Sequence, residues 1–186
     1  MLTSMDVMDL LRKYDAIKEG HFRLTSGLHS PIYFEKFQVL QHPEVASFLC
    51  AEIARRFEEE GVELVIGPAI GGIIIAYEVA RHLGARFIFA EKEDGKRVLK
   101  RGFRIKRGER TLVVEDVVTT GGSAREVIEL VRSSGGLVVG IGFIVDRTGG
   151  NVDFGVRKES LLSLDVPAYM PEECPLCRNG IPLEET

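Results

Sequence analysis

The chain has 186 residues, with 24 lysines and arginines against 28 aspartates and glutamates, so its formal net charge is −4. This length is enough for one domain, or one domain with a small subdomain, around a well-buried core. Hydrophobic residues make up 45% and charged residues 28%, close to the globular average, which excludes a disordered or fibrous chain. The mildly acidic balance gives no overall attraction to nucleic acid or to an anionic membrane, so we expect neither as a partner.

The cysteine count and the apolar stretches indicate the compartment. Three cysteines are too few for a disulfide framework, which favours a reducing environment. The N-terminal stretch carries Asp6 and Asp9 and lacks the apolar segment of a signal peptide, so we expect no export. The longest apolar stretch, 62–80, is interrupted by Pro68, by glycines and by two glutamates, and does not span a membrane. A cytoplasmic protein is the expectation.

The first part of the chain predicts a helix, a hairpin and a second helix. Apolar residues recur at helical spacing over 5–14. Two short extended runs around a Ser-Gly turn over 21–35 are typical of a hairpin. Pro43 begins a long helix in which apolar residues recur every four positions, and Gly61 ends it. We expect residues 1–40 to form a small cap, or hood, beside the main domain.

Beyond this helix, strands and helices alternate. The pattern predicts apolar strands at 62–67, 85–91, 111–116 and 137–146, helices at 71–84 and 121–136, and one more strand near 161–166. Strands apolar on both faces, alternating with amphipathic helices, indicate an α/β fold with a mostly parallel central sheet flanked by helices. We expect this domain over 41–170 and a short polar tail over 171–186. Ligands of such sheets bind beyond the carboxyl ends of the strands. Four loops therefore matter most, those after Gly67, Glu91, Asp116 and Asp146.

The loop after the third of these strands is the most informative segment. Two acids, Glu115 and Asp116, stand where the strand is expected to end, and a Thr-Gly-Gly-Ser turn then leads into a helix. A glycine-rich turn at a helix N-terminus offers unpaired backbone N–H groups and the positive end of the helix dipole. Hydroxyls of Thr119, Thr120 and Ser123 add donors, so the turn predicts a phosphate site. The carboxylates suit the hydroxyls of an attached sugar, because they accept hydrogen bonds from a diol.

A simpler interpretation of this segment stays open. Gly121 and Gly122 alone are also typical of a tight turn, with Ser123 as an ordinary helix cap. Two adjacent acids weaken that interpretation, because like charges repel each other. The chain has neither the Gly-Lys-Ser/Thr of a P-loop nor the G-x-G-x-x-G of a dinucleotide fold, which argues against a kinase and a nicotinamide oxidoreductase.

Longer runs carry a resemblance to a known family. The run VVEDVVTTGGS, 113–123, resembles the phosphoribosyl pyrophosphate signature of the type I phosphoribosyltransferases. The run LTSGLHSPIYF, 24–34, followed by IVDR, 144–147, is similar to the orotate phosphoribosyltransferases in particular. The similarity extends in order over about 16–147. It implies the type I phosphoribosyltransferase fold with an N-terminal hood, and transfer of ribose 5-phosphate from phosphoribosyl pyrophosphate to orotate in the synthesis of UMP.

The resemblance also implies how the donor is bound. The paired acids Glu115 and Asp116 would contact the ribose hydroxyls, and Thr120 to Ser123 would hold the 5-phosphate, with Thr119 also among the residues that bind the donor. The loop 67–72 matches the family's pyrophosphate loop, whose backbone faces the leaving group through Ala69, Ile70 and Gly71. Glycines at 71 and 72 permit a close approach to the ligand. A plain strand-to-helix turn is the alternative for this loop.

For the acceptor, the resemblance implies four contacts with orotate: Thr119, Arg147, Tyr33 and Phe34. An arginine makes chemical sense opposite the pyrimidine carboxylate, since its planar fork pairs with it through two hydrogen bonds. The alternative for Arg147 is a surface ion pair with Asp146 or Asp165. The alternative for the two aromatic residues is an ordinary packing role in the hood.

The stretch 91–107 holds eight basic and three acidic residues, in a chain of net charge −4. An isolated run of this kind is typical of a solvated loop. By resemblance it is the family's flexible catalytic loop, with Lys92 and Lys96 joining Asp116 as catalytic groups and Asp94 as a weaker candidate. In the family this loop reaches into the neighbouring subunit's site, which implies a homodimer. The family also implies Mg²⁺, bound mainly through donor oxygens rather than by a protein cage.

The chain departs from the family pattern in several places. Many bacterial relatives carry lysine at the positions of Thr25 and Gly71, arginine at the position of Glu91, and a histidine in the loop. Fewer cations would then face the pyrophosphate. The candidates to replace them are Arg97, Lys100 and Arg101.

Two other functions remain as alternatives. One is an enzyme of the same fold that acts on another base, against which Arg147 argues because purines lack a carboxylate. The other is a regulator that senses phosphoribosyl pyrophosphate and binds nucleic acid. Such a regulator would need a basic face outside the pocket, whereas the one strongly basic run is 91–107.

Cys174 and Cys177 have the spacing of half a zinc site, but no second such pair exists in the chain. Two chains of a dimer could together supply four thiolates; we expect instead a free, reduced pair and no metal bound by the protein. Cys50 lies on the apolar side of the long helix and is expected in the core.

Overall fold

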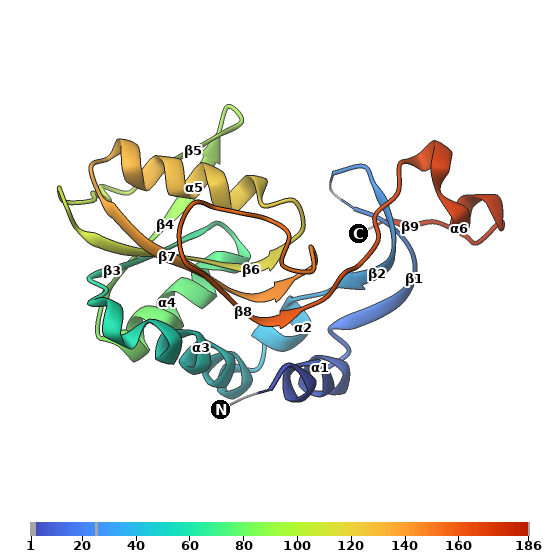
Figure 1. Ribbon diagram of the computed structural model, residues 1–186, viewed down its shortest axis with the longest axis horizontal. Helices are drawn as coiled ribbons and strands as arrows, with labels where there is room; N and C mark the ends of the chain where they lie inside the picture. The colour runs from blue at the N-terminus through green and yellow to red at the C-terminus, as the bar shows by residue number, and fades with distance from the viewer. Residues whose placement is uncertain (1–2, 25, 186) are drawn as a thin grey trace.

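The computed structural model describes residues 3–24 and 26–185, and it contains two β-sheets (Figure 1). The larger sheet has six strands in the order β5-β4-β3-β6-β7-β8. The strands are β3 (Leu64–Pro68), β4 (Arg86–Glu93), β5 (Lys96–Val98), β6 (Arg110–Val118), β7 (Leu137–Asp146) and β8 (Lys158–Ser163). Only the edge strand β5 runs antiparallel to its neighbour. The predicted α/β class with a mostly parallel central sheet is therefore confirmed.

Helices cover both faces of this sheet. The helices α3 (Pro43–Phe57) and α4 (Gly71–Leu83) pack on one face, and α5 (Gly122–Ser133) packs on the other (Figure 1). Each sends a row of buried aliphatic side chains toward the strands, because its apolar residues recur every three or four positions. Two apolar clusters result, one on each side of the sheet. Among the described residues, no helix is both long enough and apolar enough to cross a membrane.

The predicted helices are confirmed, with small shifts at their ends. The helix that begins at Pro43 ends at Phe57, and the short 3-10 helix η1 (Glu58–Glu60) replaces its expected last turn. A tighter final turn is common at helix ends. Gly61 then takes the left-handed conformation, with φ of 57°. Cys50 is fully buried on α3, as expected, and burial raises the pKa of its thiol to about 12.

Three strands differ from the predicted ranges. Strand β6 continues to Val118, so the two acids lie inside the strand rather than at its end. Strand β8 spans 158–163 rather than 161–166. The third difference is larger, because the expected loop after residue 91 begins as a hairpin in which β4 turns back into β5. Asp94 and Gly95 both have positive φ, 49° and 80°, as a two-residue hairpin turn requires.

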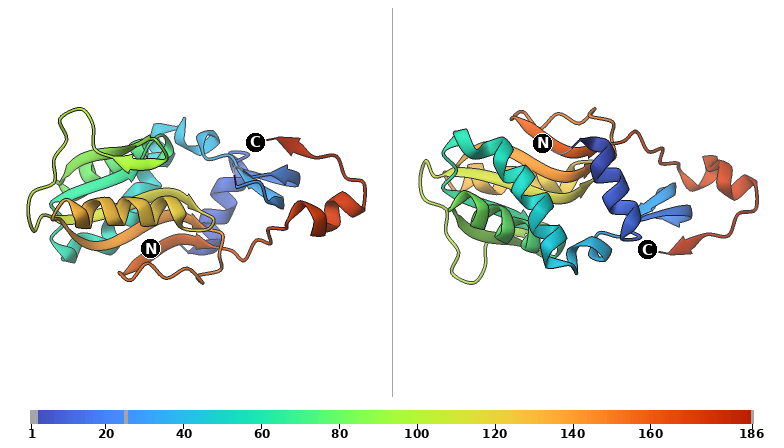
Figure 2. Two further views of the ribbon diagram at one scale, coloured as in Figure 1. Left: turned by 90° about the horizontal axis from the view of Figure 1, so that it is seen from above. Right: turned by 90° about the horizontal axis from the view of Figure 1, so that it is seen from below.

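The N-terminal elements, which we call the hood, form a small layer beside the main sheet, and Val7 and Leu11 of its helix join the apolar cluster on that side of the sheet. The hood holds helix α1 (Ser4–Lys13), strands β1 (Ile17–Arg23) and β2 (His29–Phe34), and the short helix α2 (Phe37–Leu40) that leads to the main domain. The tail adds a turn η2 (Pro171–Glu173), helix α6 (Pro175–Arg178) and strand β9 (Glu184–Glu185). Strand β9 pairs in parallel with β1, so the second sheet has the order β2-β1-β9 (Figure 2). The tail therefore folds against the hood.

Candidate active site

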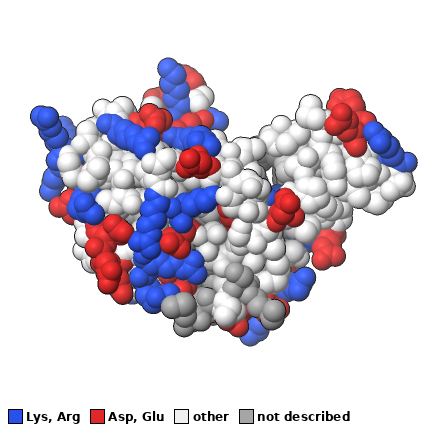
Figure 3. Space-filling view, in the orientation of Figure 1, with Lys and Arg blue, Asp and Glu red and all other residues white. Residues whose placement is uncertain are grey.

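A cavity of about 410 Å³ lies where the carboxyl end of β6 meets the hood. In the space-filling view, a notch separates the larger body from the lobe formed by hood and tail (Figure 3). The cavity brings together predicted site residues from segments far apart in the sequence. They are Tyr33, Phe34, Ala69, Glu115, Asp116, Thr119 and Arg147, and they are joined by Leu24, Ser26, Lys36, Arg97 and Val117.

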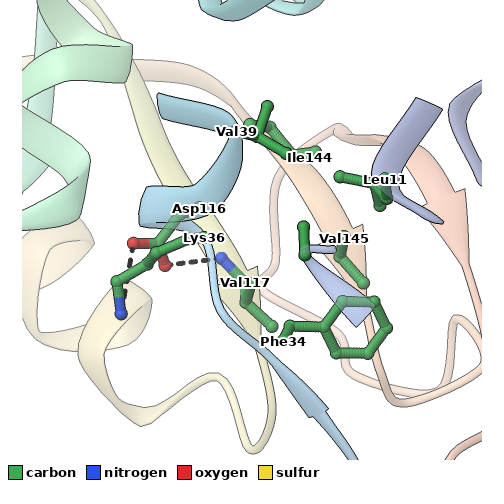
Figure 4. A pocket seen from close by; sticks show the side chains of 9 residues that line it. Leu11, Phe34, Lys36, Val39, Asp116, Val117, Ile144 and Val145 are labelled. Atoms are coloured by element: carbon green, nitrogen blue, oxygen red, sulfur yellow. Dashed lines mark hydrogen bonds and ion pairs between the residues drawn. The ribbon is translucent and has the colours of Figure 1, made fainter. Parts of the chain in front are cut away.

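The two acids form the floor of this cavity and are both buried. Asp116 accepts a hydrogen bond of 2.6 Å from the N–H of Val117, and its Oδ2 lies 3.7 Å from the ammonium of Lys36 (Figure 4). Burial, reinforced by the neighbouring Asp116, raises the pKa of Glu115 to about 7. Burial also raises the pKa of Asp116, against the opposing charge of Lys36. Two carboxyl groups held this way favour a ligand that brings hydrogen-bond donors or positive charge.

A smaller cavity beneath the acids is mostly apolar. It measures about 20 Å³ and lies between α1, the end of β2 and strand β7, where Leu11, Phe34 and Val145 meet Asp116 (Figure 4). A space of this size has room for about one water molecule. Of the two cavities, the larger one is therefore the candidate site for a small-molecule ligand.

The loop between β3 and α4 lies directly against Asp116. A Cβ atom at Gly71 would lie 1.8 Å from Oδ2 of Asp116, so no larger residue fits there unless the carboxylate moves. A Cβ atom at Gly67 would lie 2.4 Å from the carbonyl oxygen of Gly72. The glycines thus permit a close approach, as predicted, but in the described structure the approach is to Asp116 and to the loop's own backbone. Ala69 is in the cavity lining, while Ile70 is 73% exposed beside it.

The predicted phosphate turn stands at the start of α5. Gly121 has φ of 78°, and a Cβ atom there would lie 2.9 Å from Val152, so glycine is needed for both reasons. The helix begins at Gly122 without a side-chain cap, and the N–H of Gly122 donates one long hydrogen bond of 3.5 Å to the Thr120 hydroxyl, so the start of the helix is only weakly engaged within the protein. Thr119 and Thr120 are exposed beside the turn. The interpretation of Ser123 as an ordinary helix cap is wrong, because Gly121 holds the cap position.

Arg97 on β5 reaches across to this turn. Its Nη2 donates to the Ser123 hydroxyl at 2.8 Å, and its Nη1 donates to the carbonyl oxygen of Ala69 at 3.3 Å. One guanidinium thus joins the predicted pyrophosphate loop to the predicted phosphate turn. The other two candidate cations form closer ion pairs elsewhere, Lys100 with Glu93 at 2.7 Å and Arg101 with Glu91 at 3.0 Å, whereas Arg97 lies 3.6 Å from the carboxylate of Glu126. Arg97 is therefore the strongest of the three replacements.

The two predicted catalytic lysines lie on the same hairpin but outside this cavity. Lys92 stands opposite Arg97 in the strand register. Lys96 borders an open hollow against α5, together with Arg125 and Glu126. Neither lysine is among the residues that line the cavity of its own chain. Their role stays a prediction.

Arg147 is a buried cation at the other end of the cavity. It is 6% exposed, and its Nη2 donates to the Ser30 hydroxyl at 2.7 Å. Its Nε is buried without a hydrogen-bond partner among the described residues, and burial lowers the pKa of the guanidinium. The alternative of a surface ion pair is wrong, because Arg147 is buried and Asp146 accepts its hydrogen bonds from Thr148. This arginine is arranged to receive an anion.

The aromatic pair belongs both to the packing and to the cavity. Phe34 is 5% exposed and joins the apolar cluster below the sheet, and the guanidinium carbon of Arg147 lies 5.6 Å from its ring centre. Tyr33 is partly exposed and lines the cavity, with its hydroxyl 3.5 Å from a carboxylate oxygen of Glu35. A packing role and a place in the cavity wall therefore coexist.

Comparisons with known proteins agree with this geometry. The family model for the phosphoribosyl transferase domain matches residues 38–153. The orotate phosphoribosyltransferase of Pelotomaculum thermopropionicum is 56% identical over 181 residues, which covers 97% of this chain and 95% of that protein. That of Thermotoga maritima is 52% identical over 179 residues, or 96% of both. The chain belongs to the orotate phosphoribosyltransferase family.

Solved structures of the family have the same fold. The orotate phosphoribosyltransferase of Aeropyrum pernix superposes with a TM-score of 0.68 at 28% identity, over 85% of this chain and 93% of that chain. The UMP synthase of Leishmania donovani gives a TM-score of 0.74 at 26% identity, over 87% of this chain and 36% of that chain. The resemblance and the type I phosphoribosyltransferase fold expected from the sequence are both confirmed.

Two residues of the site were not predicted from the sequence. Lys36 faces Asp116, and the available signal was a lysine two residues after the aromatic pair that ends β2. Ser30 holds Arg147, and its position before Pro31 carried no such signal. The departure noted at Thr25 lies outside the described residues.

Proposed function

We propose that the chain transfers ribose 5-phosphate from phosphoribosyl pyrophosphate to N1 of orotate, with orotidine 5′-phosphate and pyrophosphate as products. One observation carries the choice of acceptor: Arg147 is buried in the same cavity as the paired acids, and its Nε has no partner among the described residues. This pentosyl transfer belongs to pyrimidine biosynthesis.

The acceptor is selected by charge. A buried guanidinium is costly unless an anion pairs with it, and a planar carboxylate offers it two parallel hydrogen bonds. Orotate carries such a carboxylate, whereas adenine and other purines do not. Tyr33 and Phe34 in the cavity wall provide apolar surface for the pyrimidine ring.

The donor is positioned by groups of opposite sign. The first N–H groups of α5, with Thr119, Thr120 and Ser123 around them, suit the 5-phosphate. The carboxylates of Glu115 and Asp116 repel a phosphate but accept hydrogen bonds from the ribose hydroxyls. The sugar would therefore lie across the acids, with its phosphate at the helix and its pyrophosphate toward the loop 67–72.

Catalysis would rest on positioning and on charge stabilisation. The C1 carbon of the ribose becomes electron-poor as the bond to pyrophosphate breaks, and the leaving group takes the electron pair and most of the negative charge. Lys36, Arg97 and Arg147 are the cations that line this cavity in the described residues; with Arg147 assigned to the acceptor, Lys36 and Arg97 would serve the pyrophosphate. No covalent nucleophile is required, because N1 of orotate itself attacks the carbon held in front of it as the bond to pyrophosphate breaks, and the N1 proton passes to solvent.

The donor atoms around the acids fit a magnesium ion. Mg²⁺ prefers oxygen ligands and keeps several waters, and Glu115 and Asp116 supply carboxylate oxygens where the ribose would lie. These residues would hold the ion through the substrate and its waters rather than by a cage. When bound, the ion would neutralise charge on the departing pyrophosphate.

The proposal includes a homodimer in the cytoplasm with shared active sites. The two predicted catalytic lysines stand on a projecting hairpin and do not line the cavity of their own chain (Figure 1). A neighbouring subunit's cavity is then the place where Lys92 and Lys96 would act.

The test is incubation of the purified protein with orotate, phosphoribosyl pyrophosphate and Mg²⁺, followed by the loss of orotate absorbance. The expected result is turnover with orotate and none with adenine, guanine or uracil. Turnover with another base alone would select a different transferase of this fold. Absence of any turnover, together with salt-sensitive RNA binding, would select a nucleic-acid-binding regulator.

A further inference from the structure

A second cluster of reactive side chains lies in the lobe formed by the hood and the tail, away from the cavity. It consists of His21 on β1, His29 on β2, Cys174 just before α6 and Cys177 within α6. One ligand atom from each of the four lies within 4.8 Å of all the others. We propose that these four side chains bind a structural Zn²⁺ ion that fastens the tail to the hood.

The spacing of the four atoms fits a tetrahedral ion. His21 Nε2 lies 3.0 Å from His29 Nδ1 and 3.5 Å from Cys174 Sγ. Cys177 Sγ lies 3.6 Å from His21 Nε2 and 3.3 Å from His29 Nδ1. With metal–nitrogen bonds of about 2.0 Å and metal–sulfur bonds of about 2.3 Å, the ligand atoms of a tetrahedral site lie roughly 3.3–3.8 Å apart. The cluster therefore needs only small movements to close around an ion.

Hydrogen bonds alone do not account for these contacts. Nδ1 of His21 lies 2.8 Å from the carbonyl oxygen of Ile181, which can only accept, so the ring proton is on Nδ1. With that proton on Nδ1, Nε2 can offer a single lone pair to a metal ion, and three groups converge on it, from His29, Cys174 and Cys177. A single lone pair that faces three other ligand atoms is well placed to bind a metal ion at their centre. The bond to Ile181 is the outer contact that commonly orients a metal-bound histidine.

The donor set selects the metal. Two thiolates and two imidazoles in tetrahedral arrangement are typical of structural zinc, and magnesium prefers oxygen. All three cysteines are free in the structure, so no disulfide competes. On binding, Cys174 and Cys177 each release a proton to solvent, and the two negative thiolates balance the charge of Zn²⁺.

The tail has little else to hold it in place. Within 171–185, Cys174 alone is buried, and most other residues are exposed. The strand β9 adds a two-residue pairing with β1 (Figure 2). So little apolar burial does not offset the conformational entropy lost when fifteen residues are ordered. Small segments without a core are commonly held by a metal ion or a disulfide.

The proposal departs from the expectation of a free, reduced cysteine pair without a metal. The chain has no second Cys-x-x-Cys pair, but the other two proposed ligands are histidines about 150 residues earlier in the chain. The fold of the hood brings them to the tail, because β1 and β2 are neighbours in one sheet and His21 and His29 point to the same side of it.

The first test measures zinc in protein purified without a histidine tag. The expected content is about one Zn²⁺ per chain in the wild type. Cys177→Ser and His21→Gln should lose most of it, while the matched controls Cys50→Ala and His82→Gln should keep it. Cys50 is buried in α3, and His82 contacts Ser47, so neither touches the cluster. Zinc that persists in His21→Gln at one ion per two chains would overturn the proposal in favour of four thiolates shared by a dimer.

A second measurement uses only the wild-type protein, so it does not depend on whether a variant folds. The wild-type protein is freed of metal with a chelator and titrated with Co²⁺. Binding at the proposed site should give intense visible bands of tetrahedral cobalt and a thiolate-to-cobalt charge-transfer band, both removed by equimolar Zn²⁺. Spectra of octahedral aqueous cobalt throughout the titration would overturn the site.

Whether the ion holds the tail against the hood can be measured separately. Limited proteolysis should cut the tail of the chelator-treated wild type at least tenfold faster than that of the zinc-loaded protein. Cleavage sites within 171–185 are expected, and added Zn²⁺ should restore protection. Equal cleavage rates in the two forms would show that the ion does not hold the tail.

Discussion

Arg97 donates a hydrogen bond to the hydroxyl of Ser123, 2.8 Å away, and so connects the β4–β5 hairpin to the first turn of α5. The same guanidinium also contacts the carbonyl oxygen of Ala69. The hairpin is thereby tied to both loops that we assign to the phosphates of the donor. An arriving donor offers this cation anionic oxygens in place of a neutral hydroxyl and a carbonyl, in competition with the carboxylate of Glu126, which lies 3.6 Å from Nε of Arg97.

The first prediction concerns this arginine. Arg97→Gln should lower kcat/KM for phosphoribosyl pyrophosphate by about 10- to 100-fold, because a charge-assisted hydrogen bond contributes about 1.5–3 kcal/mol. Steady-state kinetics with the donor varied provides the measurement. Lys100→Gln is the matched control, since Lys100 pairs with Glu93 and does not line the cavity. An equal loss in both variants would indicate a general effect of hairpin charge.

The second prediction separates acceptor from donor. Arg147→Gln should raise KM for orotate by about 10- to 100-fold, because the carboxylate loses its paired cation. Donor affinity measured by calorimetry should stay within about twofold. Arg147→Lys should recover part of the loss, since it restores the charge without the planar fork. A variant that weakens both substrates alike would contradict the assignment of Arg147 to the base.

The third prediction is a pH dependence of stability. The pKa of Glu115 is raised by burial to about 7, so the ligand-free folded state binds this proton more tightly than the unfolded state. The free energy of unfolding should therefore fall as the pH rises from about 4.5 to about 7. Glu115→Gln should stabilise the ligand-free protein at pH 8 by on the order of 1–3 kcal/mol, with little change at pH 5.

Thermal or urea unfolding at several pH values checks this sign. Glu129→Gln serves as the control, because Glu129 is exposed on α5 and pairs with Arg132. That control should leave the pH profile of the wild type unchanged. If Glu115→Gln also left the profile unchanged, Glu115 would not be the buried titrating group.

The fourth prediction concerns the shared active site. Lys92→Ala should lower kcat by about 10²- to 10³-fold without a change in melting temperature, as expected for a cation that stabilises a leaving group. If the lysine acts in the neighbouring subunit, mixing Lys92→Ala with Arg147→Gln should restore activity, because hybrid dimers contain one intact site. Mixtures that show only the sum of the two residual activities would place Lys92 in its own chain's site or outside the mechanism.

Much of the main domain could be predicted from local patterns. Helix α3 follows from Pro43, from apolar residues every four positions and from Gly61, and the buried strands follow from short apolar runs between glycines. These features depend on a residue and its near neighbours along the chain, so they can be recognised without any tertiary contact. The hairpin β4–β5 was also recognisable, since Asp94-Gly95 favours its turn, but the charge of the run pointed to a loop.

The exact ends of strands were less predictable. Strand β6 continues past Asp116 to Val118 because β7 pairs with it up to Asp146. A strand ends where its neighbour stops offering hydrogen bonds, and the neighbour is distant in sequence. The two acids therefore lie within the paired region, which helps to bury them.

The run from Glu115 to Ser123 was enough to indicate a phosphate and a diol, because the donor groups that it supplies are consecutive in the chain. The partners of Arg97, of Arg147 and of Cys177 were decided only when segments 26, 117 and 148 positions away packed beside them. Such contacts depend on how the hood, the sheet and the tail close on one another, and no local pattern of charge or hydrophobicity encodes that closure.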